Sequence, residues 1–270
     1  PCLSGWLFLW QKGQNFLILR PLIPERNQYT IHMSGHSKWS TIKRKKGALD
    51  AKRSKIFSRI IKEISVAIRE GGSDPEGNAR LRLAIANAKG ANMPKDNVQR
   101  AISKAKEKDA ANFQEVTYEG YGPNGVAIFL ECTTDNLQRT ISAVRSYFNK
   151  HNGSLGTNGS LSFVFDRKGV FTVPQGNIDP EHFEMEVIDA GAEDISLEDG
   201  YFSVTTAMED FGSMMKKLEE LGIEPENAEL QRIPRTTVKL DVDSARKVLR
   251  LIEMFEDDDD VANVFHNLEM

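Results

Sequence analysis

The spacing of apolar residues changes at Asn112, and this change constrains the fold more than any other feature of the chain. Between Ile56 and Ala105, apolar residues recur every three or four positions, which is the period of an amphipathic helix. After Asn112 they alternate with polar residues in short runs, and helical segments separate these runs. The sequence therefore predicts an α+β protein whose first part is helical.

Three helices are predicted before Asn112. The first covers residues 56–69 and ends at Gly71 and Gly72. The second is expected to take Pro75 as its first residue, and the third opens at Pro94, because proline is tolerated in a first helical turn. Residues 36–55 have little apolar periodicity and are predicted to form an extended basic arm.

The second half of the chain predicts two ferredoxin-like units. Residues 169–235 have the element order βαββαβ, which is the split-βαβ pattern. A strand–helix–strand segment at 125–166 ends in a predicted strand at 161–165, and a second such segment at 237–265 begins with a predicted strand at 237–240. Joining these two segments gives a second unit, so that one ferredoxin-like domain is inserted in the other.

Four segments follow from this reading. Residues 1–32 are expected to be a non-native or disordered extension and are excluded from the fold prediction. Residues 33–111 form a basic helical domain, residues 112–168 and 236–270 together form one α/β domain, and residues 169–235 form the inserted α/β domain. The predicted fold class is thus a helical N-terminal domain followed by two ferredoxin-like α/β domains.

The net charge of −4 hides two opposed blocks. Residues 33–110 hold 19 Lys and Arg against 8 Asp and Glu, whereas residues 111–270 hold 13 against 30. An isolated charged run is usually a solvated surface, but the local density here is high, since residues 36–55 alone carry eight basic side chains. The basic block is predicted to bind a polyanion such as nucleic acid.

The candidate nucleic-acid contacts lie between His36 and Lys62, with one more at the start of the third helix. Trp39 has two readings, because an aromatic beside charges can stack on a base or pack on the helices. The full set is His36, Ser37, Lys38, Trp39, Lys43, Arg44, Lys45, Lys46, Lys52, Arg53, Lys55, Arg59, Lys62 and Lys95.

No catalytic, cofactor or metal site is predicted. Residues 120–125 match G-x-G-x-x-G, but a strand follows them instead of the helix that a dinucleotide site needs, so a hairpin turn is favoured. The acidic run Glu256–Asp260 has ligand types that suit a divalent cation, yet a solvated loop is the favoured reading. We therefore expect a protein that is not an enzyme and has no cofactor.

The cysteines and the hydropathy pattern bear on the compartment. Cys2 and Cys132 lie far apart and outside any metal or redox motif, and Cys132 is predicted to be a core residue. No run approaches the ~18 apolar residues of a membrane span. A cytoplasmic protein without a membrane partner is expected.

Three tracts carry a family resemblance: residues 35–39, 91–97 and 118–127. Together they resemble the YebC family of regulators, and the likeness covers nearly all of residues 33–270. The resemblance implies a helical N-terminal domain, two α/β domains and no catalytic centre. Asn124 stands where the family is expected to have glycine, a small departure because asparagine tolerates left-handed backbone geometry.

The resemblance implies two functions. The family label is a DNA-binding transcriptional regulator, whereas relatives such as the mitochondrial translational activator of cytochrome c oxidase resemble ribosome-associated factors that assist translation through consecutive prolines. The partner would then be DNA, or ribosomal or transfer RNA with the ribosome. The sequence leans slightly toward RNA, since no helix-turn-helix with base-reading side chains is evident. An enzyme acting between the α/β domains and a protein-binding adaptor are the remaining alternatives.

Overall fold

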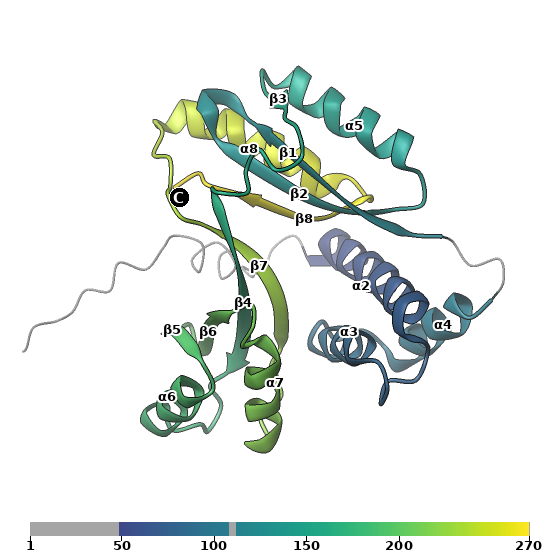
Figure 1. The fold of residues 1–270 in the computed structure, drawn as a ribbon, viewed down its shortest axis with the longest axis vertical. Coiled ribbons are helices and arrows are strands. Elements are labelled where there is room, and N and C mark those ends of the chain that lie inside the picture. Colours follow the sequence, from purple (N-terminus) through teal and green to yellow (C-terminus); the bar gives the residue numbers. More distant parts are fainter. Residues whose placement is uncertain (1–48, 108–111, 270) are drawn as a thin grey trace, which may run out of the picture. The chain divides into compact units, whose positions relative to one another are not determined.

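The computed structural model describes residues 49–107 and 112–269. Its first part contains three helices: α2 (Leu49–Gly71), α3 (Ala79–Gly90) and α4 (Lys95–Ala105) (Figure 1). Their apolar faces meet in one core, which includes Ile64, Leu81 and Ala88. The predicted extension at residues 1–32 lies outside the described residues.

Two predictions about these helices were wrong. Residues 49–55 belong to α2, so the part of the predicted extended arm that is described is helical. The second helix begins at Ala79 instead of Pro75, because the side chain of Asn78 caps it: its amide oxygen accepts the N–H of Leu81 at 3.0 Å, and its nitrogen donates to the carbonyl of Ala67 at 2.7 Å. Tertiary hydrogen bonds thus set this boundary.

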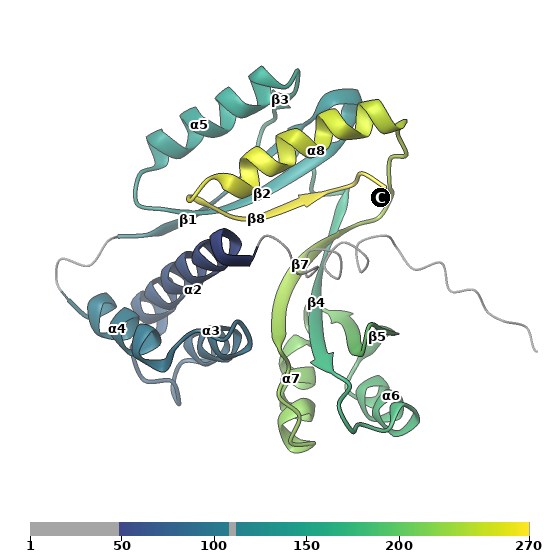
Figure 2. The same ribbon diagram turned by 180° about the vertical axis from the view of Figure 1, so that it is seen from behind.

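The first sheet has the strand order β3-β1-β2-β8 and is antiparallel. Its elements are β1 (Gln114–Tyr121), β2 (Ala127–Thr134), α5 (Leu137–Lys150), β3 (Ser154–Leu155), α8 (Val242–Asp257) and β8 (Val261–His266). Helices α5 and α8 lie side by side on one face of this sheet (Figure 2).

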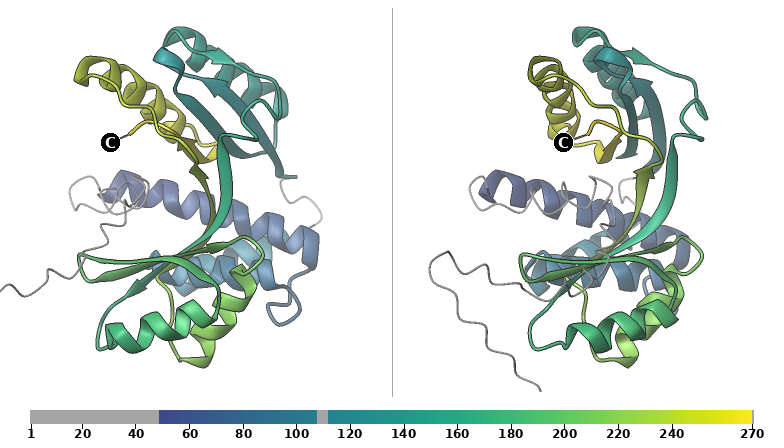
Figure 3. Two further views of the ribbon diagram at one scale, coloured as in Figure 1. Left: turned by 60° about the vertical axis from the view of Figure 1, so that its left-hand side comes forward. Right: turned by 90° about the vertical axis from the view of Figure 1, so that its left-hand side faces the viewer.

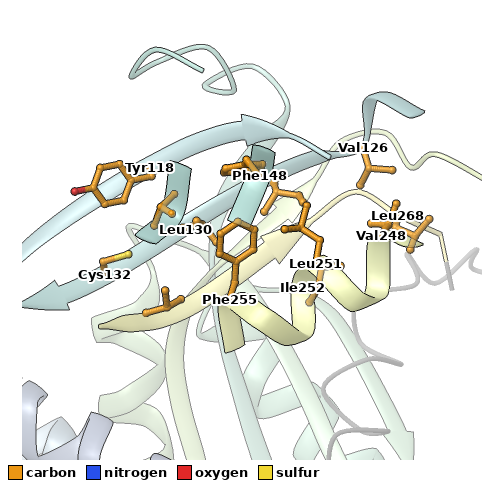
Figure 4. Packing of buried hydrophobic residues seen from close by; sticks show 13 residues of the cluster. Tyr118, Val126, Leu130, Cys132, Phe148, Val248, Leu251, Ile252, Phe255 and Leu268 are labelled. Carbon is orange, nitrogen blue, oxygen red and sulfur yellow. The ribbon is translucent and has the colours of Figure 1, made fainter. Parts of the chain in front are cut away.

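Phe148 and Phe255 form the centre of the core between this sheet and its helices (Figure 4). Both side chains are fully buried, and their ring centroids are 4.9 Å apart. Gly120 lies under Phe148, where a β-carbon would come within 2.6 Å of its ring. Cys132 is also in this core, which confirms the prediction, and burial raises the pKa of its thiol to about 12.

The second sheet has the order β5-β6-β4-β7 and is also antiparallel. Its elements are β4 (Phe165–Pro174), α6 (Pro180–Asp189), β5 (Ala192–Glu198), β6 (Tyr201–Ala207), α7 (Phe211–Glu220) and β7 (Asn227–Pro234). Both helices cover the same face (Figure 3). This element order and strand order match the split-βαβ pattern predicted for residues 169–235, and the two four-stranded antiparallel sheets confirm the predicted α+β class.

Two predicted strands of the first sheet were wrong. Residues 161–164 form turns, because the carboxylate of Glu119 accepts the N–H groups of Gly159 at 2.8 Å and Leu161 at 2.6 Å and so holds the loop away from an extended ladder. Residues 237–240 make only an isolated bridge, from Val238 to Leu268. Strands β1 and β3 complete this sheet in place of the two strands that do not form.

The G-x-G-x-x-G match is a hairpin turn, as predicted. Residues 123–125 form a short 3-10 turn (η1, Pro123–Gly125), and β1 pairs directly with β2 on either side of it. Asn124 has a φ of 59°, the left-handed geometry that asparagine tolerates.

Candidate nucleic-acid interface

The structure describes the side chains of five of the predicted contact residues. His36, Ser37, Lys38, Trp39 and the run Lys43–Lys46 lie outside the described residues, and Lys52 belongs to the described backbone of α2 but not to the described side chains. The five described residues are Arg53, Lys55, Arg59, Lys62 and Lys95.

Arg53 connects α2 with the turn that precedes Lys95. Its guanidinium donates to the carbonyl oxygen of Asn92 at 3.2 Å and lies 5.4 Å from the ring centroid of Phe57. Lys95 is exposed and is the first residue of α4. Arg53 therefore lies beside the turn that leads into α4, where Lys95 is the predicted contact residue.

Helix α4 presents a polar face of which the sequence analysis predicted only Lys95 as a contact residue. It follows α3 after a turn of four residues, 91–94, and buries Val98 and Ile102. Its exposed side carries Lys95, Gln99, Arg100 and Lys104. Amide and guanidinium groups on a helix face are the groups that hydrogen-bond base edges in a major groove.

Lys55, Arg59 and Lys62 form a basic stripe along one face of α2, and this stripe contacts the acidic run, residues 256–260. Lys55 donates to the Asp257 carboxylate at 2.5 Å, and Arg59 donates to the Glu256 carbonyl oxygen at 3.0 Å. The sequence predicted a solvated loop at the acidic run. This prediction was wrong, because the acidic run contacts the basic stripe of the same chain.

Lys62 is a largely buried member of the basic stripe. Its ammonium group donates to the carbonyl oxygens of Asp259 at 2.7 Å and Thr133 at 3.0 Å, and it lies 3.4 Å from a carboxylate oxygen of Asp260. It also lies 5.3 Å from the ring centroid of Phe113. Only 15% of its side chain is exposed, so Lys62 acts mainly as an anchor between α2 and the acidic run.

Asp260 holds the end of the acidic run in place. Its buried carboxylate accepts hydrogen bonds from Arg139 at 2.8 Å and from the hydroxyl of Thr140 at 2.9 Å. Burial alone would raise the pKa of Asp260, but the bonds from Arg139 and Thr140 and the charge of Lys62 outweigh it and hold this pKa below its ordinary value.

This lowered pKa predicts how the stability of the protein depends on pH. The contribution of Asp260 is complete above its unfolded pKa of about 3.9 and is lost as the pH falls through the lower folded pKa. Asp260→Asn is expected to destabilise the protein by about 1–3 kcal/mol at pH 7, because Arg139 and Lys62 both lose a buried carboxylate partner. In urea unfolding, this difference should shrink below about pH 4.

Asp243 offers the matched control, because 84% of its side chain is exposed. Asp243→Asn is expected to change the unfolding free energy by less than about 0.5 kcal/mol. An Asp260→Asn difference that stays the same from neutral to acid pH would contradict the assigned role.

The structure also limits other kinds of site. Within residues 49–107 and 112–269, no group of three or more His, Cys, Asp and Glu side chains is arranged to hold a metal ion. Every helix in these same ranges is too short or too polar to cross a membrane.

The fold and the interface define the class of protein: a three-helix domain with a basic first helix, followed by two ferredoxin-like units. The chain belongs to the TACO1/YebC family, since the model of the TACO1/YebC N-terminal domain matches residues 37–108 and the model of its second and third domain matches residues 113–268. This confirms the resemblance seen in the sequence.

Relatives and a solved structure agree with this assignment. A "Probable transcriptional regulatory protein" of Amoebophilus asiaticus is 52% identical, over 87% of this chain and 98% of its own length. A protein of the same name from Geotalea uraniireducens is 51% identical, over 88% and 96%. The crystal structure of a conserved hypothetical protein from Aquifex aeolicus matches 86% of this chain and 96% of its own with a TM-score of 0.77 and 44% identity.

Proposed function

We propose that this protein is a non-catalytic, cytoplasmic regulator of gene expression that binds nucleic acid, in the first place a DNA-binding transcriptional regulator. The observation that carries the proposal is the pair of Lys55 and Arg59 on one face of α2, which already bind carboxylate and carbonyl oxygens in the structure. Phosphate oxygens are acceptors of the same kind. The names of the relatives support the same reading.

The proposed interface combines the sequence-predicted residues with the described ones. Lys62 is left out because its ammonium group has three oxygen partners within its own chain. Lys55 and Arg59 are retained because each of them hydrogen-bonds to a single residue of the acidic run. The interface comprises His36, Ser37, Lys38, Trp39, Lys43, Arg44, Lys45, Lys46, Lys52, Arg53, Lys55, Arg59 and Lys95.

The exposed face of α4 supports duplex DNA as the ligand. A helix that follows another after a short turn is the arrangement that helix-turn-helix proteins insert into the major groove. Gln99 and Arg100 are exposed there, and the Arg100 guanidinium is oriented by a bond to the amide oxygen of Asn97 at 2.6 Å. Arg100 is the residue type that most often reads guanine.

Arg100→Ala is expected to reduce sequence preference more than overall affinity. The loss of one bidentate base contact should lower the ratio of promoter to random-DNA affinity by about 5- to 150-fold. Competition binding on a randomised duplex library measures this ratio. Lys150→Ala, an exposed change on α5, is the control and should leave the ratio unchanged. An unaltered preference in Arg100→Ala would exclude α4 as the reading helix.

The second candidate is a ribosome-associated RNA-binding factor that relieves stalling at proline-rich stretches. The lysine-rich segment at residues 36–55 favours it, because such a segment fits an RNA crevice as well as a DNA backbone. Co-sedimentation with ribosomes over a salt series, with and without nuclease, decides between the two when it is run beside gel shifts on promoter DNA. Ribosome association that outcompetes DNA would replace the transcriptional proposal with this one.

A further inference from the structure

The acidic run offers the basic stripe of α2 a set of oxygens that resembles a nucleic-acid backbone. Residues 256–260 are five consecutive acids, and both their carboxylate and their main-chain oxygens face Lys55, Arg59 and Lys62. The three cations lie at positions i, i+4 and i+7 of α2 and so follow one face of the helix. A polyanion that tracks this face would meet the same donors.

We propose that the acidic run occupies the basic stripe in place of nucleic acid, so that the protein controls its own affinity by internal competition. This inference rests on the proposed function, because it concerns the regulation of the same interface. Nucleic acid that reaches Lys55 and Arg59 displaces the acidic run from them. Nucleic acids of low affinity are therefore excluded from Lys55 and Arg59 by the acidic run, whereas nucleic acids of high affinity displace it.

Of the three contacts between the basic stripe and the acidic run, those of Lys55 and Arg59 can be replaced by phosphate, whereas that of Lys62 is kept. The pair of Lys55 and Asp257 is near the surface, since 32% and 77% of the two side chains are exposed, and such pairs are weak. The hydrogen bond of Arg59 goes to a main-chain oxygen, a neutral acceptor that a charged phosphate can replace. Lys62 is enclosed and keeps the acidic run tethered to α2 while the other two contacts open.

Neutralising the exposed part of the acidic run tests the competition. The double variant Asp257→Asn with Asp259→Asn leaves the buried Asp260 network intact. Its affinity for a random-sequence duplex DNA, measured by fluorescence anisotropy at fixed salt, is expected to rise about 3- to 10-fold. A single-stranded RNA of mixed sequence, as a second probe, should show the same gain, because the gain arises from the phosphates.

A matched variant separates local competition from net charge. Glu219→Gln with Glu220→Gln removes the same charge from the exposed end of α7. This control is expected to gain less than about 2-fold, since screened charges far from the ligand act weakly. Equal gains in the two double variants would overturn the inference and leave the proposed function standing.

Lys55→Gln completes the design. In the unaltered chain this change should cost little affinity, whereas in the Asp257→Asn, Asp259→Asn background it should cost more, because Lys55 is then free to bind phosphate. A loss that is the same in both backgrounds would overturn the inference. If neither probe binds any of the variants or the unaltered chain at low salt, the proposed function fails, and the inference fails with it.

Discussion

Replacing Lys43, Arg44, Lys45 and Lys46 together by glutamate is expected to abolish nucleic-acid binding. Each phosphate contact on duplex DNA releases about 0.9 counterion, so four lost contacts should flatten the plot of log affinity against log salt by about 4. The four new carboxylates also repel the backbone. Anisotropy titrations of duplex DNA and of RNA, each at several salt concentrations, measure both the affinity and the slope.

The control for this variant reverses four exposed lysines elsewhere. Changing Lys150, Lys216, Lys239 and Lys247 to glutamate gives the same change in net charge, but on the two ferredoxin-like units. This control chain should keep most of its affinity and nearly all of its salt slope. Unchanged binding by the Lys43–Lys46 variant would remove the basic arm from the interface.

Phe148→Ala is expected to cause the largest loss of stability from a single substitution. Its ring is fully buried, packs on Phe255 and fills the space above Gly120. Removing a buried phenyl ring costs about 3–5 kcal/mol, because apolar transfer energy is lost and a cavity remains. Urea unfolding followed by circular dichroism measures the change.

Phe163→Ala is the matched control, because Phe163 is 67% exposed. It should change the unfolding free energy by less than about 0.5 kcal/mol. If Phe148→Ala changed the unfolding free energy as little as Phe163→Ala, Phe148 would not be at the centre of the core between the first sheet and its helices.

The parts of the fold that sequence predicted well are those set by local pattern. Helix α4 shows its period in Val98, Ile102 and Ala105, and it begins after Pro94 as expected. The hairpin around Asn124 was predicted because a strand follows the glycines, whereas a dinucleotide site needs a helix at that position. Both outcomes depend only on residues close together in the chain.

The parts that sequence missed depend on partners far away in the chain. The alternation of Leu161, Phe163 and Phe165 is typical of a strand, but Glu119, some 40 positions earlier, binds the loop and bends it. Pro75 is a good first helical residue, yet the bonds of Asn78 to Ala67 and Gly72 move the start of α3. Propensity yields to such contacts.

The candidate interface was predicted in part for the same reason. The density of basic residues identified α2, but not what its side chains touch, since the acidic run lies about 200 positions later. The opposite signs of these two runs were the one available signal of their contact. On the exposed face of α4 the sequence predicted Lys95 but not Gln99, Arg100 or Lys104, which resemble ordinary helix-surface residues until the turn before α4 is known.

The most direct test of the account is to map where nucleic acid touches the intact chain. Photocrosslinking to iodouracil-substituted DNA and thiouridine-substituted RNA, followed by peptide mass spectrometry, identifies the contact residues. The account predicts crosslinks within residues 36–59 and in α4, and none in the second sheet or its helices. Crosslinks confined to residues 165–234 would contradict it.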